Sequence, residues 1–150
     1  MRRFLFVQKE EALKMIRTIN KNIDTLRIKS VPATIDDISV ADDLLDTLRA
    51  NSDSCVGMAA NMIGVNKSII VFNNQGEMME MFNPVITSSS GSYETEEGCL
   101  SLEGQRRTKR FHYIKVRYQD RQFVSHVKRF SGWEAQIIQH EIDHCNGIII

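Results

Sequence analysis

Residues 131–147 read SGWEAQIIQHEIDHCNG, and this stretch decides the fold. Apolar residues recur in it three and four positions apart, which is the spacing of one buried stripe on an α-helix. Ser131 and Glu134 have the spacing of a capping box at a helix start, and Gly147 is typical of a helix end. We therefore predict a helix that packs one stripe into the core, formed by Ala135, Ile138, Ile142 and Cys145.

The same helix contains the motif His140-Glu141-Ile142-Asp143-His144. Side chains four positions apart lie one turn above each other, so the two imidazoles converge on one point where a divalent metal can bind. Glu141 can reach a water on that metal, and Asp143 either orients a ligand or is a solvated helix acid. Two of the chain's 4 histidines fall in this pattern, so we favour a metal site over a chance pairing.

A catalytic metal needs a third protein ligand and one open position. The six residues that follow His144 include no His, Asp or Glu, so we expect this ligand from upstream. Cys99, in the stretch EGCLS at 97–101, is the best candidate, because Gly98 allows a close approach and a thiolate suits a borderline metal. The alternative is that Cys99 is a small buried residue. Cys145 points about 100° away from His144 around the helix, and we expect it in the core.

The rest of the chain mixes helical and strand patterns without regular alternation, which favours one α+β domain over residues 1–150. Amphipathic spacing predicts helices over 9–24 and about 38–50. Residues 92–102 are extended or looped. Strands are predicted over 68–72, 78–82 (ended by Asn83-Pro84) and 113–118, with 123–127 as the partner of the last.

Composition limits the partners. Lys plus Arg number 19 and Asp plus Glu also 19, so net charge gives no general attraction to DNA or to acidic membranes. A local basic stretch over 105–110 is either a solvated loop with one arginine for the substrate or a contact for ribosomal RNA. No apolar run reaches the roughly 18 residues of a membrane span. The odd count of 3 cysteines favours reduced thiols, so we expect a cytoplasmic location.

Three stretches together resemble the peptide deformylases. EGCLS at 97–101 is similar to the family's second motif, and QHEIDHCNG at 139–147 is similar to its third. GMAAN at 57–61 resembles part of the first, Gly-x-Gly-Leu-Ala-Ala-x-Gln. The resemblance covers about residues 40–148 and implies antiparallel β-sheets around a central metal-binding C-terminal helix.

This resemblance implies a hydrolase that removes the formyl group from N-formylmethionyl peptides. Cys99, His140 and His144 would bind one divalent metal, with Fe(II) favoured and Zn, Ni or Co as alternatives. Metal-activated water would attack the formyl carbon with Glu141 as general base. The backbone N–H of Leu100 would donate to the formyl oxygen as charge develops there.

The resemblance also implies roles for residues beside the metal. Gly57 would pair its backbone with an extended substrate, with Met58 next to it in the substrate site. Arg106 and Arg110 are candidates for substrate binding as well. Alternatively, Arg110 forms an ion pair with Glu97 that holds the loop of the second motif.

Two positions depart from the first motif. Met62 stands where the family has a Gln that donates its amide to the formyl oxygen, and a thioether cannot donate. Cys55 stands in place of the first Gly, as either a packing residue or a thiol open to oxidation. Three hypotheses follow: a working deformylase, a divergent paralogue acting on another formamide or amide, and a metal-binding protein with little or no activity because of Met62.

Overall fold

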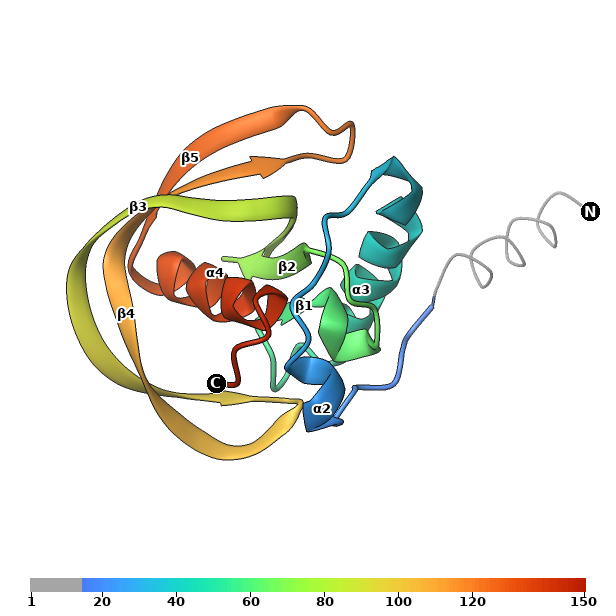
Figure 1. Ribbon diagram of the computed structural model, residues 1–150, viewed down its shortest axis with the longest axis horizontal. Helices are drawn as coiled ribbons and strands as arrows, with labels where there is room; N and C mark the ends of the chain where they lie inside the picture. Colours follow the sequence, from blue (N-terminus) through green and yellow to red (C-terminus); the bar gives the residue numbers. More distant parts are fainter. Residues whose placement is uncertain (1–14) are drawn as a thin grey trace, which may run out of the picture.

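The structure, a computed structural model, describes residues 15–150 (Figure 1). Among these residues, no helix is long and apolar enough to cross a lipid bilayer. The elements in chain order are α2 (Ile23–Leu26), the 3-10 helix η1 (Ile35–Asp37), α3 (Ile38–Ala50), β1 (Gly57–Ala59), the 3-10 helix η2 (Ala60–Ile63), β2 (Ile69–Asn74), β3 (Glu77–Cys99), β4 (Leu102–Gln119), β5 (Ser125–Ser131) and α4 (Gly132–Cys145).

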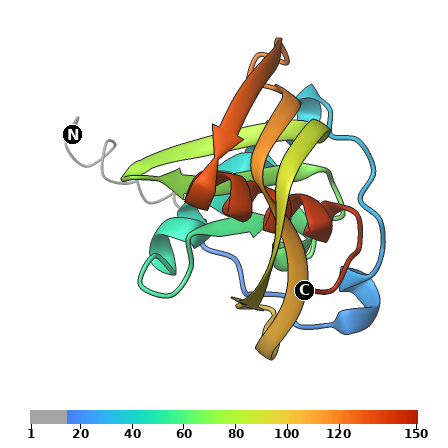
Figure 2. The ribbon, with the colours of Figure 1, turned by 90° about the vertical axis from the view of Figure 1, so that its left-hand side faces the viewer.

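The strands form one antiparallel 5-stranded sheet in the order β1-β2-β3-β4-β5. β3 and β4 form a long hairpin whose pairing runs from Phe82 and Gln119 to Cys99 and Leu102. Figures 1 and 2 show this hairpin curving around α4, which lies inside the curve. The α+β prediction, with an antiparallel sheet around a central C-terminal helix, is therefore confirmed.

β2 lies between two apolar clusters because both of its faces are buried. Ile70 and Phe72 belong to the cluster around α4, where the predicted stripe of that helix is buried as well. Ile69 and Val71 belong to a second cluster with α3 and η2. Successive strand residues point to opposite faces, so one apolar run joins the two clusters. The helix predicted over about 38–50 is confirmed as α3.

The helix predicted over residues 9–24 is wrong where the structure describes it. Its first residues lie outside the described part, residues 15–22 are not helical, and only α2 follows. The backbone N–H of Arg17 donates to Thr47 Oγ1 of α3 at 2.9 Å, and that of Asn20 donates to a carbonyl of η2 at 2.7 Å. These bonds to neighbouring elements replace helical ones, so tertiary partners overrode the local apolar spacing.

The strand predicted to end at Asn83-Pro84 continues as β3. Asn83 has a φ of 53°, and the pairing with β4 shifts register at this point. Its side chain supplies new bonds: Nδ2 donates to the Ala33 carbonyl at 3.0 Å, and Oδ1 accepts from the Ala33 N–H at 2.8 Å. Asn83 and Pro84 therefore form a β-bulge, which bends the strand instead of ending it. The stretch 113–118 pairs with the strand that follows, as predicted, but that partner covers Ser125–Ser131 instead of 123–127.

α4 begins where the sequence predicts, but the capping box is wrong. Ser131 is the last residue of β5, and its side chain makes no capping hydrogen bond. Its backbone is held in the ladder opposite Tyr113. Gly132 has a φ of 59°, which turns the chain directly from strand into helix at little steric cost. A strand-to-helix corner therefore replaces the expected cap.

The end of α4 provides a test of packing. Gly147 has a φ of 73°, and a Cβ there would collide with the Arg27 carbonyl oxygen. Gly64 has a φ of 84°, but no atom of the described residues lies within 4 Å of its Cβ position. Gly64→Ala should therefore lower the free energy of unfolding only through the strain of a left-handed backbone, by about 1–2 kcal/mol. Gly147→Ala should lower the free energy of unfolding by at least about 1 kcal/mol more, because its methyl group would also collide with the Arg27 carbonyl. Urea unfolding of both variants measures the difference, and equal losses would contradict it.

Candidate metal centre and substrate pocket

Two histidines of α4 lie close to one cysteine of the β3–β4 hairpin. The Nε2 atoms of His140 and His144 are 3.3 Å apart, and Cys99 Sγ lies 3.3 Å from His144 Nε2. The three ligand atoms lie within 4.8 Å of one another, and both histidines are buried. The structure thus brings together the three residues that the sequence selected as metal ligands.

Cys99 reaches the helix because the hairpin turns tightly beside it. β3 ends at Cys99 and β4 begins at Leu102, so only Leu100 and Ser101 form the turn. The Ser101 backbone N–H donates to Cys99 Sγ at 3.4 Å, which stabilises negative charge on the sulfur. Leu100 lines the pocket next to the cluster.

The Glu97 carboxylate contacts the His140 ring at Nδ1, the nitrogen that does not face His144. Burial by itself would raise the pKa of Glu97, but hydrogen bonds from His140, Arg110 and Gln136 lower it to about 2. Glu97 is therefore a carboxylate, which can only accept, so the 2.9 Å contact between His140 Nδ1 and Glu97 Oε1 places a proton on Nδ1. Burial by itself would lower the pKa of His140, but Glu141, Cys99 and Glu97 raise it to about 10. A metal would displace the other proton of the ring, since a His ligand binds as neutral imidazole, and the lone pair would then lie on Nε2, which faces His144.

Arg110 connects this carboxylate to α4. Its guanidinium donates to Glu97 through Nη2 at 2.7 Å and Nε at 3.0 Å, and to Asp143 through Nη1 at 2.7 Å. Its side chain is buried and lies outside the pocket lining. Of the two roles expected for Arg110, the structure therefore supports the ion pair and corrects the assignment to substrate binding. Asp143 anchors this arginine and is more than a solvated helix acid.

Glu141 points from α4 into the space between the cluster and β1. It is buried, and among residues 15–150 its Oε1 has no hydrogen-bond partner. Burial raises the pKa of Glu141 to about 7. A Cβ at Gly57 would lie 2.8 Å from Ile137 Cγ2 and 3.0 Å from Glu141 Oε2. Only glycine therefore lets β1 approach the helix this closely.

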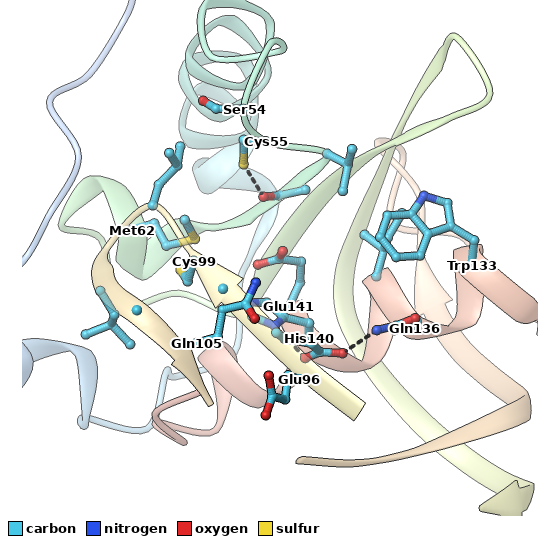
Figure 3. A pocket seen from close by; sticks show the side chains of 18 residues that line it. Ser54, Cys55, Met62, Glu96, Cys99, Gln105, Trp133, Gln136, His140 and Glu141 are labelled. Atoms are coloured by element: carbon cyan, nitrogen blue, oxygen red, sulfur yellow. Dashed lines mark hydrogen bonds and ion pairs between the residues drawn. The ribbon is translucent and has the colours of Figure 1, made fainter. Parts of the chain in front are cut away.

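A pocket of about 710 Å³ opens onto the cluster. Figure 3 shows Cys55, Met62 and Cys99 on the side opposite Trp133, with His140 and Glu141 between them. Three residues that line the pocket belong to no recognised motif, and sequence analysis did not identify them as site residues: Gln105, Trp133 and Gln136. Gln136 lies one helical turn before His140, so the same periodicity contained a signal for it.

The three ligand candidates fit a divalent metal. A thiolate and two neutral imidazoles are a donor set typical of borderline ions such as Zn²⁺ or Fe²⁺. His144 Nε2 lies 3.3 Å from both Cys99 Sγ and His140 Nε2, so the ring nitrogens and the sulfur face the same small space. The ligand atoms converge on one point, and two of the three residues line the pocket.

Comparison with known proteins gives the family. A family model described as polypeptide deformylase matches residues 13–150. A peptide deformylase from Clostridium beijerinckii is 55% identical over 136 residues, which cover 91% of this chain and 100% of that protein. The chain belongs to the polypeptide deformylase family. Members of this family remove the N-formyl group from new peptides with the help of a divalent metal.

Solved deformylase structures share the fold. A deformylase crystal structure from Legionella pneumophila has a TM-score of 0.80 at 34% identity and covers 89% of this chain and 83% of that one. A Met-Ala-Ser-bound class I type b deformylase from Acinetobacter baumannii has a TM-score of 0.82 at 27% identity, covering 90% and 97%.

Two further expectations from the deformylase resemblance need correction. Met58 is fully buried in the cluster around α3, so its side chain cannot contact a substrate. Arg106 directly follows the pocket residue Gln105, and its role in substrate binding stays a prediction. The basic stretch over 105–110 is not one free surface, because Arg110 is buried and Arg107 pairs with Glu94 at 2.7 Å. Strand alternation separates these side chains, which a count of charges along the sequence does not show.

The departures from the first deformylase motif both lie in the pocket. Met62 is buried, and its sulfur accepts from the Ala59 N–H at 3.5 Å, so it presents no donor. Burial raises the pKa of Cys55 to about 12, so this thiol stays protonated. Its S–H donates to the Gly57 carbonyl at 2.9 Å. Cys55 thus fixes one acceptor of β1.

Proposed function

We propose that this chain is a metal-dependent hydrolase that removes the formyl group from N-formylmethionyl peptides. The observation that carries the proposal is the convergence of Cys99, His140 and His144 at a pocket, with Glu141 beside them, in a member of the deformylase family. Each of these residues belongs to a motif that the family shares.

Cys99, His140 and His144 would hold one divalent metal, and we propose Fe(II), with Zn, Ni or Co as alternatives. When bound, this ion supplies a Lewis acid that lowers the pKa of water and polarises the formyl oxygen. Glu97 keeps the His140 ring in the tautomer whose Nε2 can bind metal. Arg110 and Asp143 act as positioning residues behind it.

Glu141 is the general base in this proposal. Its carboxylate takes the proton of the attacking water and passes it to the departing amine, for which its buried place in the pocket suits it. The backbone N–H of Leu100 donates to the formyl oxygen as charge develops there. Gly57 lines the pocket on the edge strand β1, and in this proposal its backbone pairs with an extended peptide.

The pocket has apolar walls that suit an unbranched thioether side chain. Val56, Met62, Trp133 and Ile137 all line it, and such walls favour burial of a methionine. We also infer action in the cytoplasm, on peptides as they leave the ribosome. Support for this location is that Cys55, Cys99 and Cys145 are all free thiols, which persist in reducing compartments.

The direct test is formate release from formyl-Met-Ala-Ser by protein purified anaerobically and loaded with Fe(II). Acetyl-Met-Ala-Ser is the matched control, since it differs only in the acyl group and should be cleaved far more slowly. Metal content and circular dichroism are measured on the same sample. Folded, metal-loaded protein that releases no formate would overturn the proposal. Faster cleavage of another formamide would instead favour the divergent paralogue.

Met62 keeps the low-activity hypothesis open. Replacing Met62 with glutamine supplies the amide donor that the family uses, and we expect kcat to rise by up to about 10²-fold. Met62→Leu keeps the volume and adds no donor, so it should leave kcat unchanged. Formate-release kinetics at full metal occupancy measure both. If Met62→Gln brings no gain, the missing amide does not limit the rate.

A further inference from the structure

One face of the sheet carries positive charge without acids. The strand segments 85–92, 111–119 and 125–131 contain no Asp or Glu, yet the chain as a whole has as many acids as bases. They contain four cations: Lys115, Arg117, Lys128 and Arg129. None of these takes part in an ion pair within residues 15–150. The charge is therefore unbalanced at this place in the fold.

The register places three of the cations together on the side away from α4. Lys115 lies directly opposite Arg129, and Arg117 lies two residues further along β4. The alternate residues Ile114 and Val116 are buried against the helix, so the cations point outward. Figure 1 shows that this outer face of β4 and β5 is turned away from α4. Like charges directly opposite destabilise a sheet, and a bound polyanion would remove that repulsion.

A hollow of about 590 Å³ lies beside Lys115 and Arg129. Two apolar residues, Ile114 and Phe130, line part of it. The rest of the lining consists of hydroxyl groups and two of the cations, from Ser88, Ser89, Ser90, Ser131, Tyr113, Lys115 and Arg129. The Ser131 hydroxyl is not used to cap α4, so it remains available. Hydroxyls and cations are the donors that contact phosphate oxygens and sugars in nucleic-acid complexes.

We propose that this face binds the sugar–phosphate backbone of single-stranded RNA, with Lys115 and Arg129 on phosphates and a base stacked on Tyr113. Tyr113 is 61% exposed at the edge of the hollow. An exposed ring beside a basic groove is the arrangement that binds unpaired bases, and a duplex would not offer a free base face. The inference does not depend on the proposed hydrolysis, since no residue of the metal centre takes part.

The test uses the metal-loaded full chain and a fluorescently labelled 12-mer of uridine, with binding followed by anisotropy between 50 and 200 mM KCl. The double variant Lys115→Ala/Arg129→Ala should lose at least about tenfold in affinity, and its salt slope should fall by about one per cation removed. The control Lys21→Ala/Lys29→Ala removes two exposed cations elsewhere and should stay within twofold of the parent. Unchanged circular dichroism and an unchanged urea midpoint show that each variant is folded.

Three results would overturn the proposal. The first is no binding by the parent chain at 50 mM KCl. The second is an equal loss in the control variant, which would indicate only general charge attraction. Tyr113→Ser should weaken RNA binding several-fold and leave binding to heparin unchanged. The third contradicting result is that heparin or phosphatidylserine vesicles bind as well as RNA and respond identically to all variants, this one included, because the face would then not select RNA.

Discussion

Replacing Glu141 with glutamine is expected to lower kcat by about 10²- to 10⁴-fold while the metal content stays unchanged. Glutamine has nearly the same shape but cannot take a proton from water. Glu141 is not one of the clustered ligand candidates, so its loss should spare metal binding. Formate release at saturating substrate measures kcat, and elemental analysis measures the metal.

Glu134 offers the matched control for this variant. It lies two turns before Glu141 on the same helix, in its first turn and outside the pocket lining. Glu134→Gln should therefore leave kcat within about twofold, as for a surface substitution. If Glu141→Gln also loses the metal, the carboxylate serves binding of the ion, and the assignment as general base fails. If its kcat is unchanged, another group moves the proton.

Replacing Arg110 with methionine is expected to lower the free energy of unfolding by about 3–5 kcal/mol. The substitution keeps an unbranched stem but leaves two carboxylates, Glu97 and Asp143, without the cation that pairs with both. The Arg110 side chain is only 4% exposed, so water cannot take over its role. Urea unfolding monitored by tryptophan fluorescence measures the loss.

The same pair of strands provides an exposed ion pair for comparison. Arg107 and Glu94 are 2.7 Å apart, and both side chains are 72% exposed. Arg107→Met should change the free energy of unfolding by less than about 1 kcal/mol, because solvent screens such pairs. Comparable losses in the two variants would show that burial of the Glu97 network does not matter. We also expect Arg110→Met to weaken metal binding about 10- to 100-fold, since Glu97 would hold His140 less firmly.

Several features could be predicted from local spacing. The stripe of α4 and the convergence of His140 and His144 follow from the helical repeat, which needs no knowledge of distant residues. α3 was predicted for the same reason. The neighbouring strands β4 and β5 were predicted from alternation around a short turn, but their register was not. The helix predicted over 9–24 does not form over 15–22, because Arg17 and Asn20 donate to distant partners instead of to a helix of their own.

The charged residues show most clearly what the order of residues along the chain does not reveal. As a sequence, residues 105–110 form a continuous basic stretch, yet in the sheet Arg110 faces the metal centre and Arg107 faces solvent. The cations on the outer face of β4 and β5 come from separate parts of the chain, and only strand register brings Lys115 opposite Arg129.

The amino-acid sequence alone was sufficient to find the two histidines, the glutamate between them and the helix that presents them, because residues four positions apart on a helix share a face. For Cys99, the sequence provided only a candidate ligand. Its meeting with those imidazoles required the curved β3–β4 hairpin, which bends at Asn83 and turns tightly after Cys99. Contacts between distant segments depend on how strands pair and bend, and a one-dimensional repeat carries no information about either.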